Sequence, residues 1–172
     1  MDERTRSRVG LVEAIKGLPM KKSSHASKPA KILLVDDEQD ILDILVRVLV
    51  SAGYDVDMAS NGQAALEKTS LQDYDLIITN MRMPVMNGEA FYRQLCSFSP
   101  RLSRRVIFCT GDIATSTTQR FLNATGAPVI FKPFQLSTLL KVVSWKLNID
   151  RVPVKAPLPP LVQPETVVAP AF

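Results

Sequence analysis

Five short apolar segments alternate with longer stretches of helical periodicity, and this alternation limits the possible folds more than any other feature of the chain. The first segment, KILLV at 31–35, ends in four consecutive apolar residues rather than alternating apolar with polar ones. Such strands are typical of parallel sheets that helices cover on both faces. The sequence predicts strands at 31–35, 54–58, 75–79, 105–109 and 129–131, and helices at 38–52, 61–69, 88–95, 113–123 and 137–147. Because crossovers between parallel strands are right-handed, we expect an α/β protein with one doubly wound, five-stranded parallel sheet.

Composition divides the chain into a folded region and two tails. Residues 1–30 carry a net charge of +4, whereas residues 31–150 carry −1. Six of the twelve prolines lie after residue 150, and proline favours extended conformations over packing. We therefore expect a flexible basic leader at 1–30, a folded domain at 31–148 and a flexible proline-rich tail at 149–172.

Several classes of protein are excluded by composition. No apolar run approaches the length of a membrane span, and the N-terminus lacks the apolar core of a secretory signal, which together favour a cytoplasmic protein. The two cysteines, Cys96 and Cys109, and the single histidine, His25, exclude a disulfide framework and the usual Cys/His zinc site. Because the basic excess lies in the tails, the folded region does not have the charge expected of a DNA-binding face.

Polar side chains follow four of the five predicted strands. Asp36 and Asp37 follow the first strand, Asn80 the third, Thr110 the fourth and Lys132 the fifth. In a doubly wound sheet these ends meet at one edge, where functional sites lie. Paired carboxylates suit Mg²⁺, and a hydroxyl with an ammonium group suits phosphoryl oxygens. One acidic residue after a strand is usually only a helix cap. Polar residues that suit a metal ion or a phosphoryl group at four strand ends favour a functional site instead.

The central region resembles the receiver domains of two-component signalling. The resemblance covers about 30–148 and rests on ILLVDDE at 32–38, DLIITNMRMPVMNG at 75–88, the Thr110-Gly111 pair and FKPF at 131–134, in the family's order and spacing. It implies a (βα)5 flavodoxin-like fold with strand order 2-1-3-4-5, in a signalling module of a phosphorelay rather than an enzyme. The segment TGAPVIFKPF is most similar to receivers attached to hybrid histidine kinases.

The resemblance also implies a role for each polar residue. Mg²⁺ would be held by Asp36, Asp37, Asn80 and the backbone carbonyl of Arg82. Thr110 would be the switch hydroxyl, and Lys132, in a cis peptide bond with the proline after it, would bind the phosphoryl group. The expected partners are a histidine kinase, a phosphotransfer protein or another receiver, with no membrane.

Asn80 departs from the family at the decisive position, where the phosphoacceptor is an aspartate. A neutral amide oxygen is a far weaker nucleophile than a carboxylate and cannot form an acyl phosphate, so this position is not phosphorylated as written. The amide reduces charge repulsion at Asp36 and Asp37 and offers one carbonyl oxygen, so we expect weakened Mg²⁺ binding. Two explanations are open: a natural receiver that works without phosphorylation, or an Asp-to-Asn change that traps the unphosphorylated form. Val129 is a second departure, because many receivers place there the aromatic residue of the switch.

The first predicted helix has an additional apolar stripe beside its inward face. Leu42, Val46 and Val50 repeat at i, i+4 and i+8. An exposed stripe of this kind commonly marks a contact site, which predicts a partner surface or a homodimer contact. Alternatively, the 9–18 segment of the leader or the last helix covers the stripe within the same chain.

Two other functions compete with a signalling receiver. A flavodoxin-like fold can bind a small ligand or a nucleotide, but the chain lacks a Gly-rich loop after the first strand and aromatic residues for ring stacking. A nucleic-acid-associated regulator would use the basic leader, so its binding would depend on salt and on residues 1–30.

Overall fold

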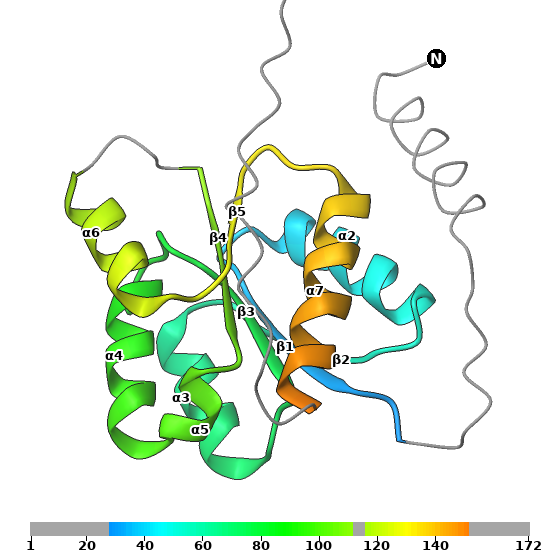
Figure 1. Ribbon diagram of the computed structural model, residues 1–172, viewed down its shortest axis with the longest axis horizontal. Helices are drawn as coiled ribbons and strands as arrows, with labels where there is room; N and C mark the ends of the chain where they lie inside the picture. The colour runs from blue at the N-terminus through cyan, green and yellow to red at the C-terminus, as the bar shows by residue number, and fades with distance from the viewer. Residues whose placement is uncertain (1–27, 112–115, 152–172) are drawn as a thin grey trace, which may run out of the picture.

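Strands and helices alternate along the chain in the computed structural model, which describes residues 28–111 and 116–151 (Figure 1). The strands are β1 (Lys31–Val35), β2 (Asp55–Ala59), β3 (Leu76–Asn80), β4 (Val106–Thr110) and β5 (Val129–Phe131). The helices are α2 (Gln39–Ser51), α3 (Gly62–Leu71), α4 (Gly88–Phe98), α5 (Pro100–Ser103), α6 (Ser116–Thr125) and α7 (Leu136–Arg151). The predicted elements are confirmed, with ends that differ by a few residues; residues 113–115, where the fourth helix was expected to begin, lie outside the described residues.

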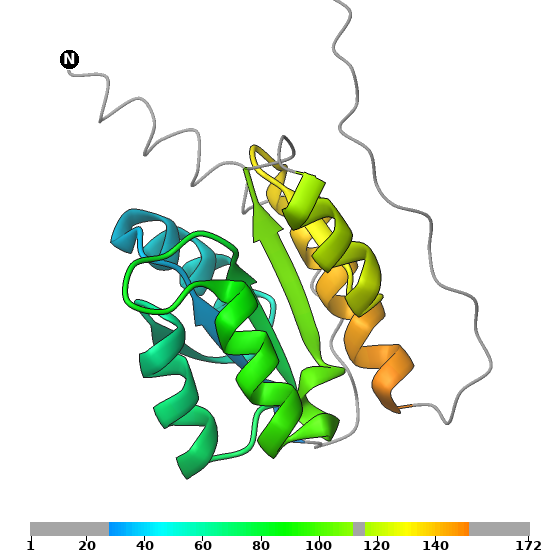
Figure 2. The same cartoon turned by 90° about the vertical axis from the view of Figure 1, so that its left-hand side faces the viewer.

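The five strands form one parallel sheet in the order β2-β1-β3-β4-β5, as predicted. Leu33 of β1, which lies between β2 and β3, is opposite Asp57 of β2 and Ile77 of β3. Helices α2 and α7 pack on one face of the sheet, and α3, α4, α5 and α6 pack on the other. Figure 2 views the molecule from the side of α4 and α6.

Alternate residues of each strand enter two separate apolar cores. Ile32 and Leu34 of β1 join the core beneath α2 and α7, whereas Leu33 and Val35 join the core beneath the other four helices. All four are at most 1% exposed. Burial on both faces explains why the strands are continuous apolar runs in the sequence.

Local signals account for most helix ends. The Asn61 side-chain oxygen accepts a hydrogen bond from the Ala64 amide at 2.9 Å, which caps α3 as predicted. After α2, Gly53 has a φ of +91°, a conformation that glycine adopts without strain. The short helix α5 was not predicted, because its four residues are too few to show a periodicity.

The predicted apolar stripe on α2 is not a continuous exposed surface. Leu42 is 2% exposed and belongs to the same core as Leu139 and Val143 of α7, so its prediction as a partner-surface residue is wrong. Val46 is half-buried against that core, and Val50 is 52% exposed. The alternative in which the last helix shares the stripe's packing therefore holds for Leu42.

The predicted flexible leader and proline-rich tail lie outside the described residues, except for 28–30 and 149–151. Helix α7 continues to Arg151, beyond the expected domain end at residue 148. None of the helices in the described ranges combines the length and apolar character needed to cross a membrane.

Charged substitutions should separate the buried from the exposed part of the stripe. We expect Leu42→Asp to lower the free energy of unfolding by about 3 kcal/mol or more, because it buries an unpaired charge. Val50→Asp, on the solvent side of the same helix, should change it by less than about 0.5 kcal/mol. Urea denaturation measures both values, and equal effects of the two substitutions would contradict this packing.

Candidate functional site

Residues from four strand ends meet at the carboxyl edge of the sheet. Asp36 follows β1, Asn80 and Thr110 end β3 and β4, and Lys132 follows β5. Asp36, Asn80 and Thr110 are buried, with exposed fractions of 4%, 8% and 1%. The backbone amide of Lys132 donates to the Thr110 carbonyl at 2.8 Å, which brings β5 to the site, and the Lys132-Pro133 bond is cis as the resemblance implied. The structure therefore places these predicted residues together.

An ion pair between a half-buried lysine and a buried carboxylate joins the first and last of these strands. The Lys132 ammonium Nζ lies 2.7 Å from Oδ2 of Asp36 and 3.7 Å from a carboxylate oxygen of Glu38. The Asp36 side chain is 5% exposed, and its Oδ1 also accepts a hydrogen bond from the Glu38 amide at 3.2 Å. A carboxylate buried to this extent needs such partners, because it has lost its hydration.

The side-chain nitrogen of Asn80 lies among three oxygens. Its Nδ2 donates to the carbonyl of Arg82 at 2.9 Å and to Oδ1 of Asp37 at 3.1 Å, with Oδ1 of Asp36 at 3.4 Å. Carboxylate and carbonyl oxygens only accept hydrogen bonds, whereas an amide nitrogen only donates them. The surroundings therefore fix the orientation of the amide.

The loop between β3 and α4 is held close to Asn80 by a glycine. The Gly88 amide donates to the Met81 carbonyl at 3.0 Å. A Cβ atom at position 88 would lie 2.3 Å from the Asn80 backbone oxygen, so a larger residue would push the loop away. The close approach of Gly88 to the Asn80 backbone holds in place the loop that carries the Arg82 carbonyl.

The predicted metal ligands converge, but they do not fit a cation as they are placed. Oxygens of Asp36, Asp37 and Arg82 surround the Asn80 nitrogen, which cannot ligate Mg²⁺ while it carries two protons. Asn80 could act as the predicted oxygen ligand only after its amide rotates. Among the residues that the structure describes, no three histidine, cysteine, aspartate or glutamate side chains form a group that could hold a metal.

Two neighbours of the site had no role predicted from the sequence. Glu38 contributes its amide and carboxylate to the ion pair, and its position directly after the two aspartates was the available signal. Cys109 precedes Thr110 in β4 and is buried. The pKa of its thiol is raised to about 12, mainly because burial disfavours the thiolate; the Lys132 charge acts to lower the pKa and the Asp36 charge to raise it. The thiol therefore stays neutral.

Val129 lies in β5, opposite Phe108 of β4. It packs, half-buried, against the core on the α4 and α6 side of the sheet. A valine has no ring to move between buried and exposed positions. The aromatic switch that the resemblance would place here is therefore absent.

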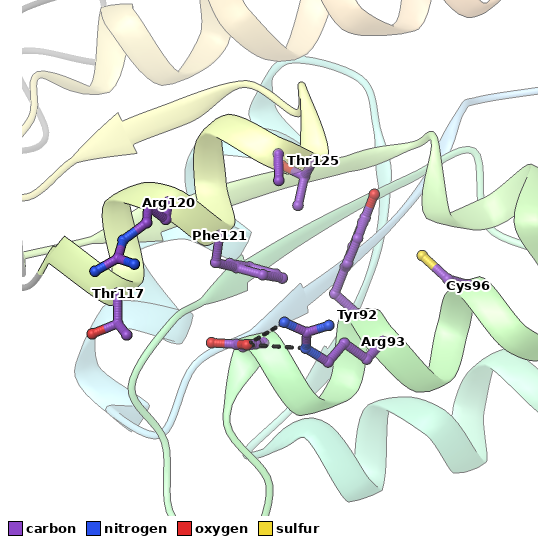
Figure 3. A pocket seen from close by; sticks show the side chains of 9 residues that line it. Tyr92, Arg93, Cys96, Thr117, Arg120, Phe121 and Thr125 are labelled. Atoms are coloured by element: carbon purple, nitrogen blue, oxygen red, sulfur yellow. Dashed lines mark hydrogen bonds and ion pairs between the residues drawn. The ribbon is translucent and has the colours of Figure 1, made fainter.

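A cavity lies away from this edge, between α4 and α6. It has a volume of about 600 Å³, and Figure 3 shows Tyr92, Arg93 and Cys96 of α4 facing Phe121 and Thr125 of α6. The Arg93 guanidinium is already paired with Glu89 at 2.8 Å. None of the predicted site residues lines this cavity.

Removing one partner of the Lys132–Asp36 ion pair should cost more than removing both. We expect Lys132→Met to lower the free energy of unfolding by about 3 kcal/mol, because the buried Asp36 carboxylate loses the ammonium group that offsets its charge. Adding Asp36→Asn should recover part of that loss. Urea denaturation of the two single variants and the double variant measures their coupling, and strictly additive losses would contradict the pairing.

The two cysteines should differ in reactivity. In the folded protein at about pH 8 we expect iodoacetamide to modify the half-buried Cys96 and to spare Cys109, whose thiol is buried and neutral. Both should react in urea. Peptide mass spectrometry checks this, and equal rates in the folded protein would show that the β4 end is open to solvent.

Known proteins with similar sequences share this region. The response regulator receiver domain family matches residues 32–144. The response regulator receiver protein CpdR of Brucella abortus is 32% identical over 117 residues, which cover 68% of this chain and 96% of CpdR. The sensor protein EvgS of Escherichia coli O157:H7 is 32% identical over 133 residues, which cover 76% of this chain and 11% of EvgS. The chain thus corresponds to nearly all of one relative and to a small part of another.

Solved structures share the fold. The CheY-like receiver domain protein of Methanospirillum hungatei has a TM-score of 0.67 at 27% identity, covering 72% of this chain and 98% of its own. The receiver domain of a histidine kinase from Syntrophus aciditrophicus has a TM-score of 0.66 at 29% identity, covering 75% and 98%. The family match, the sequence identity and the common fold show that this chain belongs to the response regulator receiver domain family of two-component signalling.

Proposed function

We propose that this chain is a receiver module that acts by binding a histidine kinase, a phosphotransfer protein or another receiver, without being phosphorylated at position 80. The observation that carries the proposal is the place of Asn80: the end of β3, between the two aspartates and on the edge that also holds Thr110 and Lys132. This is where the family's acceptor aspartate belongs. The side chain present there is a neutral amide.

The chemistry at position 80 supports this reading. Phosphoryl transfer to a receiver needs an anionic oxygen that attacks phosphorus, and the amide oxygen of Asn80 is a poor nucleophile. The lysine that would neutralise a phosphoryl group is instead paired with Asp36 at 2.7 Å. The pocket therefore has the groups that assist the transfer but lacks the group that accepts it.

Similarity to kinase-attached receivers supports the choice of partners. Receiver domains interact with histidine kinases or phosphotransfer proteins. The sensor protein EvgS is similar to this chain in sequence, and the receiver domain of a histidine kinase is similar to it in structure. The homodimer contact proposed for the first helix now rests on Val46 and Val50, because Leu42 is buried.

Restoring the carboxylate should restore the chemistry. With acetyl phosphate and Mg²⁺, the unaltered protein should gain no phosphoryl group, whereas Asn80→Asp should gain one, because charge stabilisation and positioning are nearly all that such a transfer requires of the protein. Intact-protein mass spectrometry measures the gain, which should be stable in acid and labile in base.

Variants of the assisting residues serve as controls. In the Asn80→Asp background, Lys132→Ala and Asp37→Ala should each abolish the mass increase, while Asn123→Ala, on the exposed side of α6, should leave it unchanged. Phosphorylation of the unaltered protein on another side chain would contradict the assignment of position 80. An unmodified but folded Asn80→Asp variant would show that the pocket has diverged at more than one residue.

Partner binding needs its own measurement. Purified histidine kinases and phosphotransfer proteins of the host should be titrated with the unaltered chain and with Asn80→Asp. We expect the two forms to bind the same partner with similar affinity, because binding precedes transfer. Phosphoryl transfer from that partner should reach only the Asn80→Asp form. Absence of binding to every member of these classes would contradict the proposed function.

A further inference from the structure

We propose that the Asn80 side-chain amide takes the place of the divalent cation, so that the acidic pocket of this chain is closed and electrostatically satisfied without metal. This inference rests on the proposed function only for the position of Asn80 in a receiver pocket. It differs from simple loss of a ligand, because here Asn80 opposes metal binding instead of contributing to it.

The convergence of oxygens on one nitrogen is the first support. The three oxygens come from two separate loops, after β1 and after β3, and all lie within 3.4 Å of Asn80 Nδ2. They belong to Asp36, Asp37 and the Arg82 backbone, the same groups whose oxygens would ligate Mg²⁺. An ion needs to sit among these oxygens, and the amide nitrogen is already there.

Charge compensation is the second support. Both oxygens of the Asp36 carboxylate have donors: Oδ2 has the Lys132 ammonium, and Oδ1 has the Glu38 amide and the Asn80 nitrogen. An aspartate at position 80 would instead add a carboxylate to those of Asp36, Asp37 and Glu38, with one lysine to offset them. That arrangement needs a cation, whereas the present one has donors in its place.

An opposing arrangement makes the inference testable. If the amide turned by half a rotation, its oxygen could ligate Mg²⁺, and Asn80 would then favour the ion. The turn would break the hydrogen bonds from Nδ2 and set a fourth oxygen against those of Asp36, Asp37 and Arg82 before the ion arrives. Removing the amide therefore has opposite effects on metal affinity under the two arrangements.

Magnesium titration of the full chain distinguishes them. By isothermal titration calorimetry, we expect no saturable uptake by the unaltered protein up to about 10 mM Mg²⁺, and binding at least about tenfold tighter in Asn80→Ala, because the nitrogen no longer blocks the oxygens. Asn80→Asp should bind tightest, and its thermal midpoint should rise by several degrees with Mg²⁺. Asn123→Ala is the matched control and should behave as the unaltered protein does.

Specific outcomes would overturn the inference. Weaker binding in Asn80→Ala than in the unaltered chain would show that Asn80 is a ligand, and so would unaltered-chain affinity equal to that of Asn80→Asp. Adding Asp37→Ala to Asn80→Ala should abolish the gain; a persistent gain would place the ion elsewhere and would also refute the inference.

A measurement on the unaltered chain covers the case in which Asn80→Ala fails to fold. The Asn80 side-chain NH₂ signals in an ¹⁵N NMR spectrum should stay in place as Mg²⁺ is added, and a saturable shift would contradict the blocked pocket. None of these experiments uses a phosphodonor or a partner. A failure of the proposed function therefore appears in the phosphorylation and binding assays, and a failure of this inference appears in the metal titrations.

Discussion

The buried carboxylate of Asp36 is the constraint on which the edge of the sheet depends. At 4% exposed it has almost no water, so its charge must be met by protein groups. Three groups do so: the Lys132 ammonium after β5, the Glu38 amide at the start of α2, and the Asn80 side chain at the end of β3. A parallel sheet supplies them because its strand ends share one edge, although the residues are up to 96 positions apart in sequence. The site and the fold therefore stabilise each other.

Asn80 changes what this edge requires. With an aspartate, a fourth carboxylate would join those of Asp36, Asp37 and Glu38 around one lysine, and the charge would favour a cation or a change of loop structure. With the amide, the carboxylates of Asp36, Asp37 and Glu38 meet one ammonium and a set of hydrogen-bond donors. The Gly88 contact keeps the β3–α4 loop close enough for the Arg82 carbonyl to accept from the same nitrogen. The amide group of Asn80, in the position of a carboxylate, thus accounts for both proposals: the missing phosphoacceptor and the blocked metal position.

The residue pattern was sufficient for the strands and for the group of polar residues at the edge of the sheet, and the resemblance to receiver domains supplied the strand order. Consecutive apolar residues identify strands that are buried on both faces, and the ends of parallel strands have only one place to meet. It was not sufficient for Leu42, because helical spacing shows which residues share a stripe but not which neighbouring helix covers it. Nor could it give the orientation of the Asn80 amide, which depends on three acceptors brought from distant segments. The four-residue helix α5 was too short to produce a periodic signal.

Under the proposed function, the two usual means of transmitting phosphorylation are missing together. The acceptor is neutral, so no added charge can pull Lys132 from Asp36. Position 129 is a valine packed beside the Phe108 strand, so no ring is available to report a change at Thr110. The absence of both the phosphoacceptor and the aromatic residue fits a module whose partner-binding surface stays in one conformation. Its regulation must then come from the amount or the state of the partner rather than from the pocket.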